Sequence, residues 1–157
     1  MKKTILIIVI LLDSLLLIAC GKNELGTINE LSFEIPKTFS NCEKNESQYS
    51  CTYKNNTNFC SVSISNGVSL EEKDAKKSVK FLLYVNNDVE IEYSEENING
   101  YIWTRGYVKN DGNGWQKMLY LINDYNGSKY QISYDCTLNT DLSSNTFKAF
   151  VSSLKFN

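Results

Sequence analysis

The sequence contains no histidine among its 157 residues, and this absence excludes several kinds of chemistry. Ser-His-Asp triads, Cys-His dyads, imidazole-ligated zinc and proton shuttling by imidazole all need that side chain. The sequence also lacks the Gly-x-Ser-x-Gly, P-loop, Gly-x-Gly-x-x-Gly and calcium-loop motifs. We therefore predict a protein that is not an enzyme and that has no catalytic residues, no bound metal and no cofactor.

An excess of positive charge is lacking as well. The chain has 16 Lys and Arg residues against 18 Asp and Glu residues, a formal net charge of -2 and a pI of about 5.2. A surface that follows nucleic-acid phosphates is normally basic, so we predict no nucleic-acid partner. The composition, 42% hydrophobic and 22% charged, is typical of a folded globular chain and not of a disordered one.

The first twenty residues have the pattern of an export signal. Lys2 and Lys3 precede an apolar stretch over residues 5–19, which Asp13 and Ser14 interrupt. That stretch is shorter than the ~20 residues needed to span a bilayer, and Asp13 would cost roughly 2.5 to 3.5 kcal/mol near its centre. We predict a signal peptide at residues 1–19 and no permanent transmembrane anchor.

Leu17-Ile18-Ala19-Cys20 resembles the lipobox of bacterial lipoproteins. The resemblance implies that Cys20 is linked to diacylglycerol and becomes the mature N-terminus, where several acyl chains give stable membrane anchoring. Gly21 in place of Asp after Cys20 suggests, by resemblance to enteric sorting, placement in the outer membrane. An ordinary cleaved signal in which Cys20 is incidental is the alternative. We predict a tether at residues 20–30 and a single domain at residues 31–157.

Four further cysteines remain after cleavage: Cys42, Cys51, Cys60 and Cys136. An even number of cysteines in an exported domain predicts two disulfides. Gaps of eight, eight and seventy-five residues do not form the paired knuckles typical of a structural zinc site. Exported cysteines also favour an oxidising Gram-negative periplasm.

The alternating faces of the flanking segments give a preferred pairing of these cysteines. Cys60 shares a face with Val62 and Ile64, and Cys136 shares a face with the apolar positions before it, so both are expected in one core. We favour Cys60 with Cys136 and Cys42 with Cys51. The main alternative joins Cys51 to Cys60 across a hairpin whose turn lies at residues 55–56.

Apolar alternation predicts seven strands. They lie at residues 31–35, 49–53, 60–64, 89–93, 101–108, 115–122 and 129–136. Pro36 ends the first strand, and Asn99-Gly100, residues 110–114 and Asn126-Gly127 give tight turns between the last four. Strand 115–122 has apolar residues on both faces, which a sheet covered on both sides would explain.

Two helices are predicted from a change to helical spacing. Ser69 with Glu72 forms a capping box for a helix that ends near Tyr84. A second helix closes the chain, with Phe147, Phe150, Val151 and Leu154 on its apolar face. The expected order is β-β-β-α-β-β-β-β-α.

Residues 31–157 resemble the PsbP-like sandwich group, which includes bacterial DcrB-like lipoproteins. The resemblance rests on "LSFEIPKTF", "ING" leading to "WTRGYV", "KYQISYDC" and the terminal "FKAFVSSLKF". It implies an α+β fold, mostly an antiparallel sheet flanked by helices in an α/β/α sandwich. It also implies a scaffold for binding and assembly, with no catalytic residues to carry over.

Arg105, the single arginine, is the best candidate for a partner-binding residue. It alternates with Trp103 and Tyr107 along one predicted strand, so the three side chains could present a bidentate anion contact framed by aromatic rings. The alternative is that Trp103 and Tyr107 cover the core while Arg105 stacks over them and directs its guanidinium outward.

We predict a non-catalytic, membrane-anchored, periplasm-facing lipoprotein that binds another protein or an envelope component. An immunity protein or inhibitor against a secreted toxin or envelope enzyme is the second hypothesis. A hydrolase that uses carboxylates is the third hypothesis, with Glu90, Glu92, Glu95 and Glu96 clustered around Tyr93. It is disfavoured because Glu90 and Glu92 fit the solvent face of an alternating strand and nothing singles out a pair with a defined separation.

Overall fold

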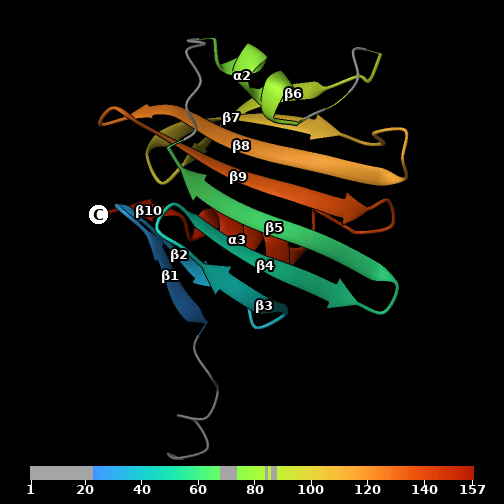
Figure 1. The fold of residues 1–157 in the computed structure, drawn as a ribbon, viewed down its shortest axis with the longest axis horizontal. Helices are drawn as coiled ribbons and strands as arrows, with labels where there is room; N and C mark the ends of the chain where they lie inside the picture. Colours follow the sequence, from blue (N-terminus) through green and yellow to red (C-terminus); the bar gives the residue numbers. More distant parts are fainter. Residues whose placement is uncertain (1–22, 68–73, 84, 86–87) are drawn as a thin grey trace, which may run out of the picture.

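A computed structural model of the chain describes residues 23–67, 74–83, 85 and 88–157. Its strands form two antiparallel sheets (Figure 1). The smaller sheet has the order β1-β2-β10, with β1 at Glu24–Ile28, β2 at Leu31–Ile35 and β10 at Lys155–Phe156. The larger sheet has the order β3-β4-β5-β9-β8-β7-β6. Its strands are β3 (Phe39–Lys44), β4 (Gln48–Asn55), β5 (Asn58–Asn66), β6 (Glu92–Ile98), β7 (Tyr101–Val108), β8 (Trp115–Tyr125) and β9 (Ser128–Thr137).

Asparagine in the left-handed conformation forms several of the tight turns. Asn99 and Gly100 have φ values of 51° and 91°, and Asn126 and Gly127 have values of 50° and 79°. Two positive φ values in a row are what a two-residue type I′ turn needs, and its twist matches that of the strands it joins. The turns predicted at these two Asn-Gly pairs are confirmed.

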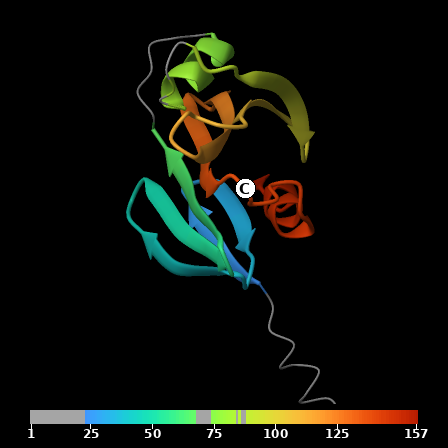
Figure 2. The same ribbon diagram turned by 90° about the vertical axis from the view of Figure 1, so that its right-hand side faces the viewer.

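One face of the larger sheet, which we call the inner face, packs against the smaller sheet and helix α3 (Asn145–Ser152). Figure 2 shows the larger sheet curling around α3. Phe33 of β2 meets Tyr49 of β4 at 5.3 Å between ring centroids, and Phe147 of α3 meets Tyr134 of β9 at 5.6 Å. These aromatic contacts join the two sheets and the helix into one core.

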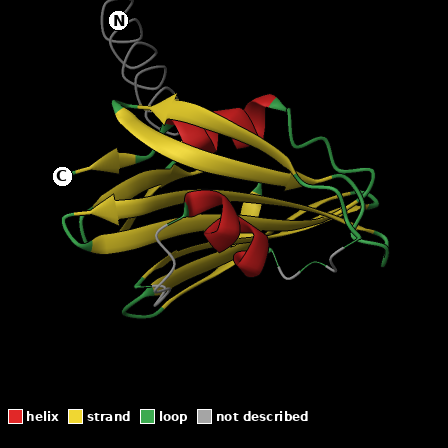
Figure 3. Ribbon diagram, turned by 90° about the horizontal axis from the view of Figure 1, so that it is seen from above, coloured by secondary structure: helices red, strands yellow, loops and turns green. Residues whose placement is uncertain are grey.

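The opposite, outer face is covered at one end by helix α2 (Ala75–Leu82). Val79 and Leu83 pack with Val108, Leu119 and Leu121 in a second, smaller cluster. Figure 3 shows α2 and α3 on opposite sides of the strands. The apolar residues on both faces of β8 are thereby explained, because Met118, Tyr120 and Ile122 belong to the main core while Leu119 and Leu121 lie beneath α2.

The α/β/α sandwich that we expected is wrong. Much of the inner face is covered by a second sheet, so the main packing is sheet on sheet, with α3 beside the smaller sheet. The order is also different: β-β-β-β-β-α-β-β-β-β-α-β. The strand predicted at residues 31–35 is β2, which pairs with β1 and β10 and not with the larger sheet.

Three strands were absent from the predicted set because each has little apolar alternation. β1 lies inside the predicted tether and exposes Leu25 (73%), β3 buries only Phe39, and β10 has two residues. Strand β6 begins three residues later than the strand predicted at 89–93, because Val89 and Ile91 pack against the α2 cluster before the strand starts.

The first helix begins later than predicted. Asp74 is its N-cap, and the carboxylate accepts hydrogen bonds from the backbone N–H groups of Lys76 and Lys77. The predicted capping box of Ser69 and Glu72, and Tyr84 at the predicted helix end, lie outside the described residues.

Two disulfides join Cys42 to Cys51 and Cys60 to Cys136, the pairing that we favoured. Cys60 and Cys136 lie directly opposite each other on β5 and β9, with Cα atoms 4.1 Å apart and both side chains buried. The other disulfide links β3 to β4 where the register shifts between Ser40 and Glu43. The alternative pairing of Cys51 with Cys60 is not adopted, because Cys51 lies opposite Val62.

Candidate functional site

A hollow of about 240 Å³ lies between strand β6, strand β8 and helix α3. It is lined by Glu96, Asn97, Ile98 and Asn99 from β6 and its turn, by Met118 and Tyr120 from β8, and by Leu142, Phe147, Lys148, Val151 and Ser152 from α3 and the loop before it. We call it the α3 hollow. Its floor is apolar, since Met118, Phe147 and Val151 are buried, while Glu96 and exposed Lys148 place charges of both signs around it.

Asn99 closes one end of the α3 hollow. Its side-chain amide donates hydrogen bonds to the backbone carbonyls of Ser152 and Leu154, at 2.9 and 2.7 Å. The first of these carbonyls belongs to the last residue of α3 and the second lies two residues beyond it, where backbone acceptors have no partner within the helix. The β6–β7 turn is therefore fastened to the end of α3, and the walls of the hollow are held at a fixed separation.

Arg105 lies beside the α3 hollow and is partly enclosed. Its Nε donates to Met118 Sδ at 3.2 Å and lies 3.6 Å from Glu96 Oε1. Its guanidinium carbon is 5.4 Å from the centre of the Tyr107 ring, a cation–π arrangement. The side chains of Arg105 and Glu96 are 25% and 38% exposed, so this ion pair is screened by water and contributes modestly to stability.

Tyr120 completes a polar cluster with Glu96 and Arg105. Burial, followed by the negative charge of Glu96, raises the pKa of Tyr120 to about 12, while the positive charge of Arg105 acts in the opposite direction. The phenol is protonated at neutral pH, as an unperturbed tyrosine is, and can donate a hydrogen bond. A strongly shifted pKa in a hollow is a reason to consider the position as a binding site.

Tyr107 is held by a hydrogen-bonded network that leads away from the hollow. Its hydroxyl donates to Gln116 Oε1 at 3.2 Å, and Gln116 Nε2 donates to the carbonyls of Thr137 and Thr140 at 2.9 and 2.7 Å. Gln116 is buried (4% exposed) and is hydrogen-bonded through both ends of its amide. This network fixes the ring on which Arg105 stacks.

The structure separates the three residues of the predicted partner-binding row. Trp103 is 1% exposed and stacks on Phe156 at 6.1 Å, so it belongs to the core and is closed to a partner in the folded domain. Arg105 and Tyr107 remain half-buried beside it, and a binding role for them stays a prediction. Cys20 lies outside the described residues, and its lipidation stays a prediction too.

Sequence reasoning did not identify Glu96, Tyr120 or Lys148 as a group. In the sequence, Glu96 is one of several carboxylates in an acidic segment, and Tyr120 is one of the apolar positions of the strand predicted at 115–122. Strand pairing brings Glu96 and Tyr120 to Arg105, because Glu96 lies opposite Trp103 on β7 and Tyr120 lies opposite Arg105. Lys148 joins them from α3, which lines the same hollow. Alternation on each strand was visible, but the register between strands was not.

No family model matches the chain, and no curated protein matches it. Its fold is similar to that of a Bacteroides thetaiotaomicron protein whose crystal structure was determined at 1.50 Å, with a TM-score of 0.52 and 15% sequence identity. The match covers 87% of this chain and 48% of the other, so the chain spans about half the length of that protein. At this identity the likeness concerns the fold alone.

Within the described residues, no helix has the length and apolarity needed to cross a membrane. In the same part of the chain, no three His, Cys, Asp or Glu side chains come together as a group that could hold a metal ion.

Proposed function

We propose that this protein is a non-catalytic bacterial lipoprotein, anchored through Cys20 and facing the periplasm, whose domain binds another protein of the cell envelope. The lipobox-like sequence before Cys20 supports the anchor. The two disulfides suit an oxidising compartment. Gly21 supports the outer membrane of a Gram-negative bacterium as the location.

The observation that carries the binding role is the position of the α3 hollow relative to the N-terminal end of the domain. The described chain begins beside β1, which packs against β4 and β5. The hollow lies at the other end of the larger sheet, beside β6 and β8. Five strand spacings separate β4 from β6, roughly 24 Å along the curved sheet at the usual spacing. Helix α3 stands between the hollow and the start of the described chain, because Asn23 shares a depression with Asn145 and Ala149 on one side of the helix while Lys148 and Ser152 line the hollow on the other. In a domain tethered at its N-terminus, the hollow therefore lies across α3 from the tether.

The anchor is tested with the substitution Cys20→Ala in the full chain. We expect the wild-type protein to enter the detergent phase on phase separation and the variant to stay in the aqueous phase, because acyl chains and not a spanning helix would hold the protein at the membrane. A Cys20→Ala protein with a confirmed cleaved signal that still enters the detergent phase would refute the lipoprotein assignment.

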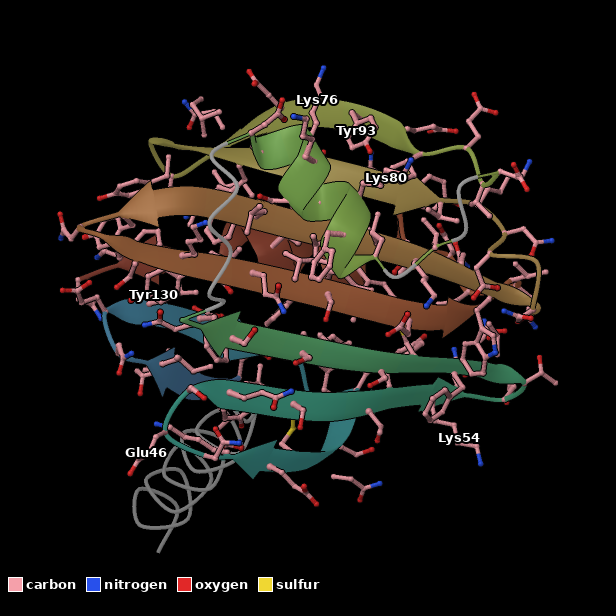
Figure 4. The ribbon with its side chains drawn as sticks, turned by 45° about the horizontal axis from the view of Figure 1, so that its top comes forward. Glu46, Lys54, Lys76, Lys80, Tyr93 and Tyr130 are labelled. Carbon is pink, nitrogen blue, oxygen red and sulfur yellow. A yellow bond between two sulfur atoms is a disulfide. The ribbon has the colours of Figure 1, made fainter. Side chains whose placement is uncertain are left out.

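The binding role is tested by placing a photo-crosslinking amino acid at Lys148, which is exposed beside the α3 hollow. Lys54 is the control, since it is also exposed and lies at the far end of the sheet, near β4 (Figure 4). We expect irradiated cells to give a discrete heavier adduct of the full chain at Lys148 and not at Lys54. Equal adducts at both positions, or none at either, would contradict the proposal.

A further inference from the structure

Strand β6 is an edge of the larger sheet and has one hydrogen-bonded neighbour, β7, among the described strands. An edge strand presents backbone N–H and C=O groups that can pair with another chain. The strand has seven residues and no proline, so an added strand could pair along its whole length. It therefore has the backbone geometry that strand addition requires.

The charge of this edge selects against a second copy of the chain and in favour of a basic partner. Between Phe81 and Thr104 the sequence has five carboxylates, at Asp88, Glu90, Glu92, Glu95 and Glu96, and no lysine or arginine. Most of these carboxylates are exposed. Of the basic side chains nearby, Arg105 pairs with Glu96, and Lys76 of α2 lies over the ring of Tyr93, 5.9 Å from its centre. Two such edges would repel each other. On an incoming strand, a basic side chain opposite Glu92 would lie on the inner face of the sheet, and one opposite Glu95, three residues further on, would lie on the outer face.

The α3 hollow lies directly beside this edge. Glu92, Ser94, Glu96 and Ile98 lie opposite residues of β7 that face the inner side of the sheet, and the hollow is lined by residues 96–99. A strand added outside β6 continues the same alternation, so one of its inner-face side chains would lie at the hollow. The buried, apolar Met118, Phe147 and Val151 favour an aliphatic side chain there.

We propose that an extended basic segment of the partner protein adds to the β6 edge as a further antiparallel or parallel strand and places one aliphatic side chain in the α3 hollow. The backbone of β6 supplies the affinity, and the acidic edge and the hollow supply the selectivity. This inference rests on the proposed binding role and names the chemistry of the partner.

The probe is a synthetic peptide of about nine residues in which a central leucine has, on each side, two lysines three residues apart and valine at the remaining positions, so that lysines lie on both faces of the strand. Its affinity for the purified full chain in detergent is measured by calorimetry. Two comparison peptides have glutamate in place of lysine, or N-methyl groups on every backbone nitrogen. We expect binding of the lysine peptide alone, because the second peptide repels the edge and the third cannot donate the backbone hydrogen bonds.

Paired variants locate the site. The double variant Glu92→Lys with Glu95→Lys should lower the affinity for the lysine peptide by about tenfold or more and raise the affinity for the glutamate peptide. The matched control is Glu43→Lys with Glu46→Lys, at β3 and the turn after it, on the opposite edge of the same sheet. Both residues are exposed, and Glu46 is labelled in Figure 4. This control should leave the affinity within about twofold of the wild-type value.

The hollow is tested on α3 itself. Ser152 is exposed and lines the hollow, so the indole of Ser152→Trp should fill the hollow and lower the affinity for the lysine peptide by about tenfold. Ala149 is exposed on the same helix but outside the hollow, so Ala149→Trp should leave that affinity unchanged. Circular dichroism and melting temperature confirm that each variant is folded.

Three results would overturn the inference: equal binding of the N-methylated peptide, equal weakening by both edge variants, or self-association of the full chain through β6. If these occur while Lys148 still gives its discrete adduct, the strand-addition inference fails and the proposed binding role stands. If the adduct is missing as well, both fail.

Discussion

Arg105 is positioned by aromatic and sulfur contacts on the inner face and not by a dense set of ion pairs. Its guanidinium stacks on Tyr107 and its Nε donates to Met118 Sδ. Its ion pair with Glu96 has a distance of 3.6 Å between Arg105 Nε and Glu96 Oε1. Removing the side chain therefore takes away packing as well as charge.

We expect Arg105→Ala to lower the free energy of unfolding by about 1 kcal/mol, with a smaller loss for Arg105→Lys, which keeps the charge but not the planar stack. Urea unfolding at neutral pH measures both. A change smaller than the error of the measurement in Arg105→Ala would mean that the contacts with Tyr107 and Met118 contribute nothing to stability.

The buried phenols make the domain sensitive to alkali. Tyr120 has its pKa raised to about 12, and burial also raises the pKa of Tyr134 well above its ordinary value. The ordinary value of 10.0 applies to the unfolded chain, so the unfolded state releases these protons first as the pH rises. The contribution of these protonated phenols to the free energy of unfolding is fully present below pH 10 and is lost as the pH rises from 10 towards their folded-state pKa values.

For Tyr120, the loss between pH 10 and pH 12 amounts to roughly 2 kcal/mol. Urea midpoints measured from pH 8 to pH 11.5 should fall above pH 10, and Tyr120→Phe should fall less steeply than the wild type. Parallel curves for the two proteins would show that Tyr120 does not titrate differently in the two states.

The hydroxyl of Tyr134 is buried without a hydrogen-bond partner among the described residues. A buried hydroxyl without a partner loses its hydrogen bonds to water on folding and forms none with the protein, which destabilises the folded state by about 1 kcal/mol or more. We expect Tyr134→Phe to raise the free energy of unfolding by about 1 kcal/mol, measured by urea unfolding at pH 7. A clear loss of stability would mean that the hydroxyl has a partner in solution.

At the scale of the element, α2 approaches β7 so closely that it needs a glycine beneath it. A Cβ at Gly106 would overlap Val79 Cγ1 and lie 3.1 Å from Leu83 Cδ1. Val79 is fully buried in the small cluster under α2, so the neighbouring side chains have little room to move.

Gly106→Ala should therefore destabilise the domain by about 1 to 3 kcal/mol through overpacking. The double variant Gly106→Ala with Val79→Ala restores the space and should be more stable than the sum of the two single losses implies. Additive losses in thermal or urea unfolding would show that the two positions do not compete for the same volume.

Strands in which apolar and polar residues alternate, or in which both faces are apolar, were predicted from the sequence. Strands with few apolar residues were missed. Residues 101–108 and 115–122 were identified because buried and exposed positions alternate or because both faces are apolar. In β3 only Phe39 is buried, and in β1 Gly26 occupies an inward position that carries no apolar signal. The extra sheet was missed for this reason, and the α/β/α arrangement was wrong as a result.

The candidate site was less predictable than the strands. Arg105 was singled out because it is the single arginine between aromatic residues, but its neighbours Glu96 and Tyr120 come from two other strands. Which residues meet depends on strand register, and register depends on the turns and on the whole buried face. The turn at Asn99-Gly100 could be predicted, while the hydrogen bonds from Asn99 to the end of α3 could not.

At the scale of the whole molecule, the two disulfides differ in the length of chain that they close. Cys42 and Cys51 are 9 residues apart in sequence, and Cys60 and Cys136 are 76 apart. In the chain-entropy account, the longer loop restricts the unfolded ensemble more strongly.

We expect replacement of Cys60 and Cys136 by alanine to cost about 4 kcal/mol, and replacement of Cys42 and Cys51 by alanine about 3 kcal/mol. The burial of both Cys60 and Cys136 adds a cavity contribution to the first value. Urea unfolding without reductant gives both. A larger loss from the Cys42 and Cys51 pair would contradict the entropic ranking.

Tension applied between the start of β1 and the β6 edge would cross the larger sheet at right angles to its strands. Every pair of neighbours in the described sheet is also consecutive in sequence, except β5 and β9. Peeling under load would begin at that seam, where no turn ties the two strands together. The Cys60–Cys136 bond spans this seam, so a covalent link carries the force there. If the proposed anchor and partner pulled on these two ends, the molecule would resist tearing more strongly while oxidised than once reduced, when only the hydrogen bonds between β5 and β9 and the packing of β2 against β10 and α3 would hold its two halves together.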